Sequence, residues 1–123
     1  MPDLRITVDG EELGASWTDE NSETREAIAD EFPLEGEAAR WGEELYFDVP
    51  VEVAAEETQT EVPVGAVAYW PAGPALCLFW GPTPASQDET PRAASPVAVV
   101  AELNDVGPLS EIDGGAHVRV EDA

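Results

Sequence analysis

The side chains that most often carry catalysis are scarce in this chain, which has one histidine, His117, and one cysteine, Cys77. A zinc site needs three or four His or Cys ligands, so zinc chemistry is excluded. Hydrolysis by a serine would have to use His117, and no nucleophile-elbow glycine pattern marks a serine partner. The carboxylates show no EF-hand spacing. We therefore expect neither a metal nor a cofactor, and we expect Cys77 to be a small buried residue rather than a reactive thiol.

Aromatic side chains are better candidates for a functional site, because several of them lie in a stretch from Val62 to Gln87 that contains no charged residue. Charged residues make up 26% of the chain, so chance does not explain an uncharged stretch of this length. Within it, residues 66–70 and 75–80 are apolar at consecutive positions, which indicates strands with apolar surroundings on both faces. One of these faces must fill the core.

The second face of these strands leaves three roles open: more core, a groove for a peptide or small molecule, or a contact between subunits. A monomer and a homo-oligomer are therefore both compatible with the sequence. The side chains that we expect to bind a ligand, if this face forms a groove, are Tyr46, Phe47, Tyr69, Trp70, Phe79 and Trp80, with Thr83 and Ser86 as polar groups on the adjoining loop.

These side chains must be positioned by short strands, which the pattern predicts over most of the chain. One helix is expected at Ser22–Glu31, capped by Asn21 or Ser22 and stopped by Pro33. About eight short strands separated by Gly and Pro turns, with one helix, are typical of a closed or nearly closed β-barrel. The length fits a single domain over residues 1–123. The predicted strands are 4–8, 12–17, 36–41, 44–48, 66–70, 75–80, 96–103 and 116–121, with a short helical turn at 109–112.

The charge balance is extreme. Asp and Glu total 27 against five basic residues, all of them arginine, which gives a net charge of -22. Such a charge on a small domain would repel itself strongly in dilute buffer. In molar salt the screening length falls to about 3 Å, and the repulsion becomes tolerable. We therefore expect a cytoplasmic protein of a salt-accumulating halophile, with most carboxylates on a solvated surface.

The same balance excludes several classes of partner. Nucleic acid binding needs a basic patch, and no such patch can be assembled from five arginines scattered along the chain. An acidic membrane surface is disfavoured for the same reason. Prolines interrupt the uncharged stretch too often for a membrane-spanning helix, and no signal peptide is visible at the N-terminus. The lone Cys77 fits a reducing compartment.

Four segments carry a resemblance to a known family. They read WGEELYF at 41–47, AYWPAG at 68–73, ALCLFWGPTP at 75–84 and ASPV at 94–97. Together and in this order they are similar to a family of small stand-alone cyclophilin-like domains of bacteria and archaea, and the resemblance extends almost from end to end. It implies a cyclophilin-type barrel with a helix at its side, here in a halophilic archaeal member, and it implies no established activity.

The resemblance also introduces prolyl isomerisation as an activity to consider. That reaction needs an apolar pocket that favours the twisted amide over both planar forms, against a barrier of about 18–20 kcal/mol. An arginine near the prolyl carbonyl usually supplies the polar contact, and the candidates are Arg92 first and Arg40 second. No motif here sets an arginine and a histidine as cyclophilins do. We therefore expect a binding module for a peptide or small molecule, with weak peptidyl-prolyl isomerase activity as the alternative.

Overall fold

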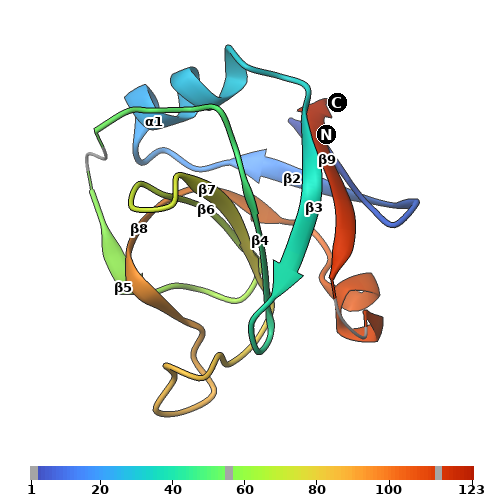
Figure 1. Cartoon of the computed structure of the whole chain (residues 1–123), viewed down its shortest axis with the longest axis vertical. Helices are drawn as coiled ribbons and strands as arrows, with labels where there is room; N and C mark the ends of the chain where they lie inside the picture. Colours follow the sequence, from blue (N-terminus) through green and yellow to red (C-terminus); the bar gives the residue numbers. More distant parts are fainter. Residues whose placement is uncertain (1–2, 55–56, 113–114) are drawn as a thin grey trace.

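The strands of the computed structural model, which describes residues 3–54, 57–112 and 115–123, form one sheet that closes into a ring (Figure 1). Strand β2 pairs with β1 on one side and with β8 on the other, so eight strands complete the ring in the order β2-β1-β9-β3-β4-β7-β6-β8, and β5 adds to β8. The prediction of a mainly β fold with about eight strands closed on themselves is confirmed. The strands are β1 (Leu4–Val8), β2 (Glu11–Trp17), β3 (Leu34–Arg40), β4 (Glu44–Asp48), β5 (Gln59–Glu61), β6 (Ala66–Trp70), β7 (Ala75–Phe79), β8 (Arg92–Leu103) and β9 (Ala116–Asp122).

The interior of the ring is the main hydrophobic core. Side chains alternate along each strand between the interior and the outside, as the pleat requires, and every strand of the ring contributes to the interior. In β1, for example, Leu4, Ile6 and Val8 are buried while Arg5 is exposed. Further buried members of the same cluster include Leu13, Leu34, Leu45, Phe47, Val67, Tyr69, Leu76, Leu78, Val100, Val118 and Val120.

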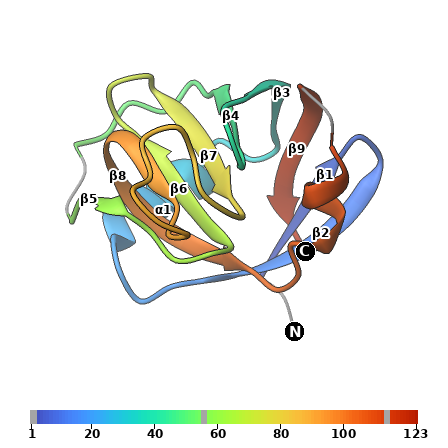
Figure 2. The same ribbon diagram turned by 90° about the horizontal axis from the view of Figure 1, so that it is seen from below.

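Helix α1 (Ser22–Ala29) lies at one end of the ring, beyond β6 and β8 (Figures 1 and 2). Its Ile28 is 1% exposed and packs into the interior, and Phe32 just after the helix stacks on Trp17 at 6.1 Å between ring centroids. The 3-10 turn η1 (Gly107–Glu111) adds the buried Leu109 to the same core. No helix in the described part of the chain is long and apolar enough to cross a membrane.

Asn21 precedes α1 but does not cap it with its side chain, contrary to one of the two predicted caps. The side chain is buried and is used for tertiary contacts instead: Nδ2 donates a hydrogen bond to the Val99 carbonyl at 2.9 Å, and Oδ1 accepts one from the Glu57 amide at 2.7 Å. These bonds connect the helix to β8 and to the segment before β5. The helix also ends at Ala29, two residues before the predicted end at Glu31.

Strand β8 is longer than predicted, because it begins at Arg92 rather than at Pro96. Its second half pairs with β6 as far as Tyr69 opposite Ala98, and beyond that point its first half pairs with β5. Sequence reasoning missed β5, since the three residues Gln59–Glu61 are polar and show no apolar alternation. Where β8 leaves β6, it no longer pairs within the ring. Its first half and β5 lie over the outer face of the sheet instead.

That outer face carries a second apolar cluster. Strands β6 and β7 are buried along almost their whole length, as their consecutive apolar residues predicted. Their outward side chains pack under β5 and the first half of β8, which therefore act as a partial second layer. The buried members of this outer cluster are Val62, Ala66, Ala68, Cys77, Phe79, Ala93, Val97 and Val99, with Tyr46 and Trp70 half-buried against them.

Candidate functional site

A cavity of about 250 Å³ opens on the outer face of the sheet, between β4, β6 and β7 on one side and the first half of β8 on the other. Its volume lies just below the roughly 300–1,000 Å³ of sites for drug-sized ligands, so it suits a molecule or group of side-chain size. The walls are predominantly aromatic and apolar. The lining residues are Trp41, Glu44, Tyr46, Trp70, Cys77, Ala93, Ala94 and Val97.

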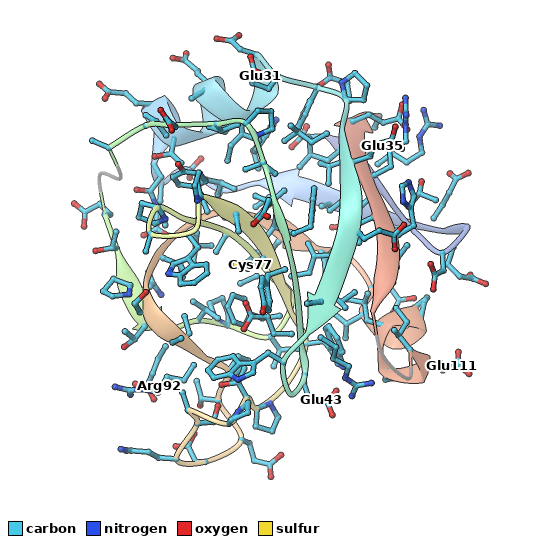
Figure 3. All side chains as sticks on the ribbon, viewed as in Figure 1. Glu31, Glu35, Glu43, Cys77, Arg92 and Glu111 are labelled. Atoms are coloured by element: carbon cyan, nitrogen blue, oxygen red, sulfur yellow. The ribbon has the colours of Figure 1, made fainter. Side chains whose placement is uncertain are left out.

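Alternation along β4 explains how a carboxylate reaches this cavity. Leu45 and Phe47 point into the ring, so Glu44 and Tyr46 must point outward. The neighbouring strand β7 places Cys77 opposite Tyr46 in the ladder and also on the outer face. Figure 3 shows Cys77 over β7, between the ribbons of β4 and β8. Glu44, Tyr46 and Cys77 therefore form the side of the cavity that the sheet provides.

Trp70 bridges the gap between the two layers. It is the last residue of β6, beyond the final β6–β8 pair, and its indole Nε1 donates a short hydrogen bond to Ser95 Oγ on β8. Its ring also meets Tyr46 edge to face, with centroids 6.3 Å apart and an interplanar angle of 82°. The hydrogen bond from Nε1 and the contact with the Tyr46 ring together restrict the rotation of the indole, so this wall of the cavity is preorganised.

Glu44 is the most unusual group at the cavity, because its side chain is charged in water yet the residue is only 5% exposed. Burial among apolar walls disfavours the carboxylate and raises the pKa of Glu44 to about 7, while a hydrogen bond from the Cys77 thiol opposes the shift. Burial, together with the neighbouring Glu44 charge, also raises the pKa of the Cys77 thiol well above its usual range. The site thus offers a carboxyl that changes protonation near neutral pH and a thiol that stays protonated.

The turn before β4 fixes where Trp41 and Glu44 lie. Gly42 has φ +62°, and a Cβ there would lie 2.7 Å from Thr83 Cα and 2.8 Å from Pro84 Cδ, so this turn packs backbone against the loop after β7. The Glu43 amide donates to the Pro82 carbonyl at 3.0 Å across the same contact. The glycine of the WGEE segment is therefore needed for the turn before β4 to lie close against the loop after β7.

The structure separates the aromatic residues that the sequence grouped as ligand candidates. Tyr46 and Trp70 line the cavity. Phe47, Tyr69 and Trp80 belong to the core inside the ring, where the Tyr69 hydroxyl donates to the Val51 carbonyl at 2.6 Å. Phe79 is fully buried in the outer cluster.

The two polar candidates stabilise the loop that leads into β8. Thr83 Oγ1 donates a short hydrogen bond to the Arg92 carbonyl, and the Thr83 amide donates to Ser86 Oγ at 2.9 Å. Ser86 Oγ in turn donates to the Thr90 carbonyl at 2.7 Å. Neither side chain is among the residues that line the cavity. Both therefore act on the start of β8, whose Ala93 and Ala94 do line it.

The two arginine candidates lie in different settings. Arg40 Nε donates to the Gly42 carbonyl at 2.8 Å, another guanidinium nitrogen donates to the Ile112 carbonyl, and the group stacks over Trp80 at 5.5 Å. This arginine is thus occupied with holding the turn before β4. Arg92 is half-buried at the start of β8, immediately before Ala93, and in Figure 3 its side chain extends away from Cys77.

The single histidine belongs to a surface cluster elsewhere. His117 on β9 contacts Glu35 Oε2 at 3.0 Å and Glu37 Oε1 at 3.1 Å, both on β3. Hydrogen bonds that the protonated imidazole donates to these two carboxylates raise the pKa of His117. Across the described residues, no group of three or more His, Cys, Asp or Glu side chains is arranged to hold a metal ion.

Sequence reasoning missed Glu44, Trp41 and the small residues of β8. Glu44 was counted with the solvated acids, although its two-residue spacing from Tyr46 on a strand puts both on one face. That spacing is a signal that could have identified it. Ala93 and Ala94 gave no such signal, because their place depends on the pairing of β8 with β5.

Comparisons with known proteins agree with this fold. The sequence model described as cyclophilin-like matches residues 2–121. The solution structure of the hypothetical protein AF2241 from Archaeoglobus fulgidus superimposes with a TM-score of 0.82 at 41% identity, over 99% of this chain and 95% of that one. The structure of McbB in complex with tryptophan superimposes with a TM-score of 0.72 at 15% identity, over 96% of this chain and 44% of that one, a likeness of fold alone. No curated protein matches the sequence.

The raised pKa of Glu44 predicts a pH-dependent effect of the substitution Glu44→Gln. The folded protein keeps the proton up to about pH 7, whereas the unfolded chain loses it near 4.5. The wild type should therefore lose stability relative to Glu44→Gln as the pH rises between these values, by on the order of 3 kcal/mol, and no further above them. Urea denaturation of both proteins over this pH range measures the difference.

Glu43→Gln is the matched control, since it removes a neighbouring carboxylate that lies 3.4 Å from Arg40 and outside the cavity. It reports how much of any effect follows merely from the change in net charge. A stability difference between wild type and Glu44→Gln that stays constant with pH would contradict the burial of an ionisable Glu44.

Proposed function

The chain belongs to the cyclophilin-like family, and on that basis we propose that it is a binding module that holds a small molecule or a peptide side chain in the cavity on its outer face. The observation that supports this function best is Glu44, a buried carboxyl at an aromatic cavity. Apolar pockets that contain a few convergent polar groups, one of them with a shifted pKa, are the usual form of ligand sites.

The position of Glu44 has no evident benefit for folding. Burying a carboxyl costs free energy unless it is paired, and the polar partner that the described residues give it is the Cys77 thiol, a weak donor. A glutamine or an apolar residue would fill the same space at lower cost. Retaining a carboxyl there is understandable if a ligand uses it.

The aromatic walls supply the rest of the binding free energy. Trp41, Tyr46 and Trp70 offer large, rigid surfaces, and Trp70 is already held by Ser95, so little side-chain entropy is lost on binding. McbB, of which 44% superimposes on this chain, was solved in complex with tryptophan. Its low identity carries no residue over to this chain, but a small aromatic molecule is a reasonable first probe.

We also infer that the module works at high salt, in a salt-accumulating cytoplasm. The supporting observation is the net charge of -22, which is tolerable only when screened. Binding experiments belong in about 2 M KCl, where nonspecific attraction of cations to the acidic surface is also suppressed.

The binding function predicts that filling the cavity abolishes binding. Ala94 is exposed and lines the cavity, so Ala94→Phe should fill it without disturbing the core. We expect small aromatic amines, alcohols or acids to shift the indole N–H signals of Trp41 and Trp70 in NMR spectra of the wild type. These shifts should disappear in Ala94→Phe.

Val64→Phe is the matched control, because Val64 is 55% exposed and lies outside the cavity. It should bind the same probes as the wild type does. The binding function is wrong if none of the probes shifts these signals, or if Ala94→Phe binds as well as Val64→Phe.

The alternative function is a weak peptidyl-prolyl isomerase, and the position of Arg92 next to two cavity-lining residues, Ala93 and Ala94, favours it. A prolyl ring would fit an apolar cavity of this size, and Arg92 would have to turn toward the prolyl carbonyl. A prolyl-peptide assay in about 2 M KCl decides between the functions. The binding module predicts no turnover above background, whereas turnover that Arg92→Ala removes would establish the isomerase.

A further inference from the structure

We propose that the natural ligand of this cavity is a small organic cation, with its ammonium group against the Glu44 carboxylate and its apolar body between Trp41, Tyr46 and Trp70. This inference rests on the proposed binding function and specifies the chemistry of the ligand. It follows from what the walls of the cavity offer and from what they lack.

The walls offer two features that attract cations. Glu44 is the one charged residue among the described residues that line the cavity, and it is negative when ionised. The faces of Trp and Tyr rings are negative ends of a quadrupole, and they attract ammonium groups more strongly where water is excluded. An aromatic enclosure with a carboxylate at its base is complementary to an ammonium ion in both charge and shape.

The walls lack what other ligands would need. An anion would meet Glu44 and the aromatic faces with no arginine, lysine or histidine among the lining residues to pair with it. A neutral alcohol or amide could donate to Glu44 but would leave a buried carboxylate without a counter-ion, which is costly. A cation is the class that neutralises this charge.

Protonation of Glu44 should make the affinity for a ligand depend on pH, and the direction of this dependence distinguishes a cation from other ligands. A cation binds the ionised carboxylate, so its affinity should rise with pH through the Glu44 pKa of about 7 and then level off. A ligand that prefers the neutral carboxyl would show the opposite trend. The other titratable groups that face Glu44 are Tyr46 on its own strand β4 and Cys77 on β7, whereas β6, β8 and the turn before β4 contribute Trp70, Ala93, Ala94, Val97 and Trp41, which do not titrate.

The size of the cavity favours a free small molecule over a segment of protein. A volume of about 250 Å³ accommodates a whole aromatic or branched amine. We therefore assign the site to a free amine, and a lysine side chain of a peptide is an outcome that the test separates.

The test compares three probes of nearly equal shape by isothermal titration calorimetry in about 2 M KCl: phenethylamine, 2-phenylethanol and phenylacetate. At about pH 8 phenethylamine should bind at least tenfold more tightly than either of the others. Its affinity should fall about tenfold between about pH 8 and about pH 6, because most of the Glu44 carboxyl is protonated at the lower pH.

Variants assign the effect to Glu44. Glu44→Gln should remove both the preference for the amine and its pH dependence, while 2-phenylethanol, if it binds, should be affected less than twofold. Glu43→Gln removes an equal charge from the next residue and should keep the preference. A lysine-containing peptide that binds more tightly than phenethylamine, and loses its affinity in Glu44→Gln, would overturn the assignment to a free amine.

The outcomes separate this inference from the binding function itself. If 2-phenylethanol or phenylacetate binds as tightly as the amine at about pH 8 and Ala94→Phe abolishes that binding, the cavity binds ligands but the cation is wrong. An amine preference that persists in Glu44→Gln would also overturn it. If no probe binds, both the cation and the binding function are rejected.

Discussion

A sheet that closes into a ring shields one of its faces, and in this protein the other face of two strands is apolar as well. The outward side chains of β6 and β7 must therefore be covered by something outside the ring. The chain supplies the cover by letting β8 leave β6 after the Tyr69–Ala98 pair and continue beside β5. The cover is incomplete at the end of β6, where Trp70 reaches across to Ser95, and the cavity lies at that opening.

The same geometry sets the electrostatics of the site. Of the 27 acidic residues, most can keep their charge in contact with water and salt, whereas Glu44 lies under the partial second layer. When it is ionised, the Glu44 carboxylate is a costly buried charge whose hydrogen-bond donor is the Cys77 thiol, and near neutral pH it competes with the neutral acid. A ligand that supplies positive charge and fills the aromatic enclosure would relieve that cost. The stability of the site and the proposed affinity for a cation would therefore both depend on the protonation of Glu44.

Most of the fold could be predicted from the sequence, because alternation and turn residues act locally. The bounds of β4 and β6 agree with the pattern, and the uncharged stretch indicated two strands apolar on both faces. The path of β8 could not be predicted, since it depends on β5, a strand of three polar residues with no local signal. Without that path, nothing in the sequence indicated that Ala93 and Ala94 would face a cavity.

The candidate site was predictable in part. The set of aromatic candidates included Tyr46 and Trp70, which line the cavity. It also included Phe47 and Tyr69, which lie two residues after Leu45 and Val67 and therefore share their face inside the ring. Glu44 was overlooked because the acidic composition predicts most carboxylates to lie on the solvated surface. In such an acidic chain, the face of the strand on which a carboxylate lies indicates a functional site better than the presence of the carboxylate does.

A buried, ionisable Glu44 that can receive a ligand is tested by a carbon-13 NMR titration of the glutamate side-chain carboxyls, with Glu44→Gln to assign the signal. We expect one carboxyl, absent from that variant, to titrate near pH 7, and saturating phenethylamine to lower the midpoint of its titration. A spectrum in which no glutamate carboxyl titrates well above the ordinary value of 4.5 would show that Glu44 is not a buried ionisable carboxyl.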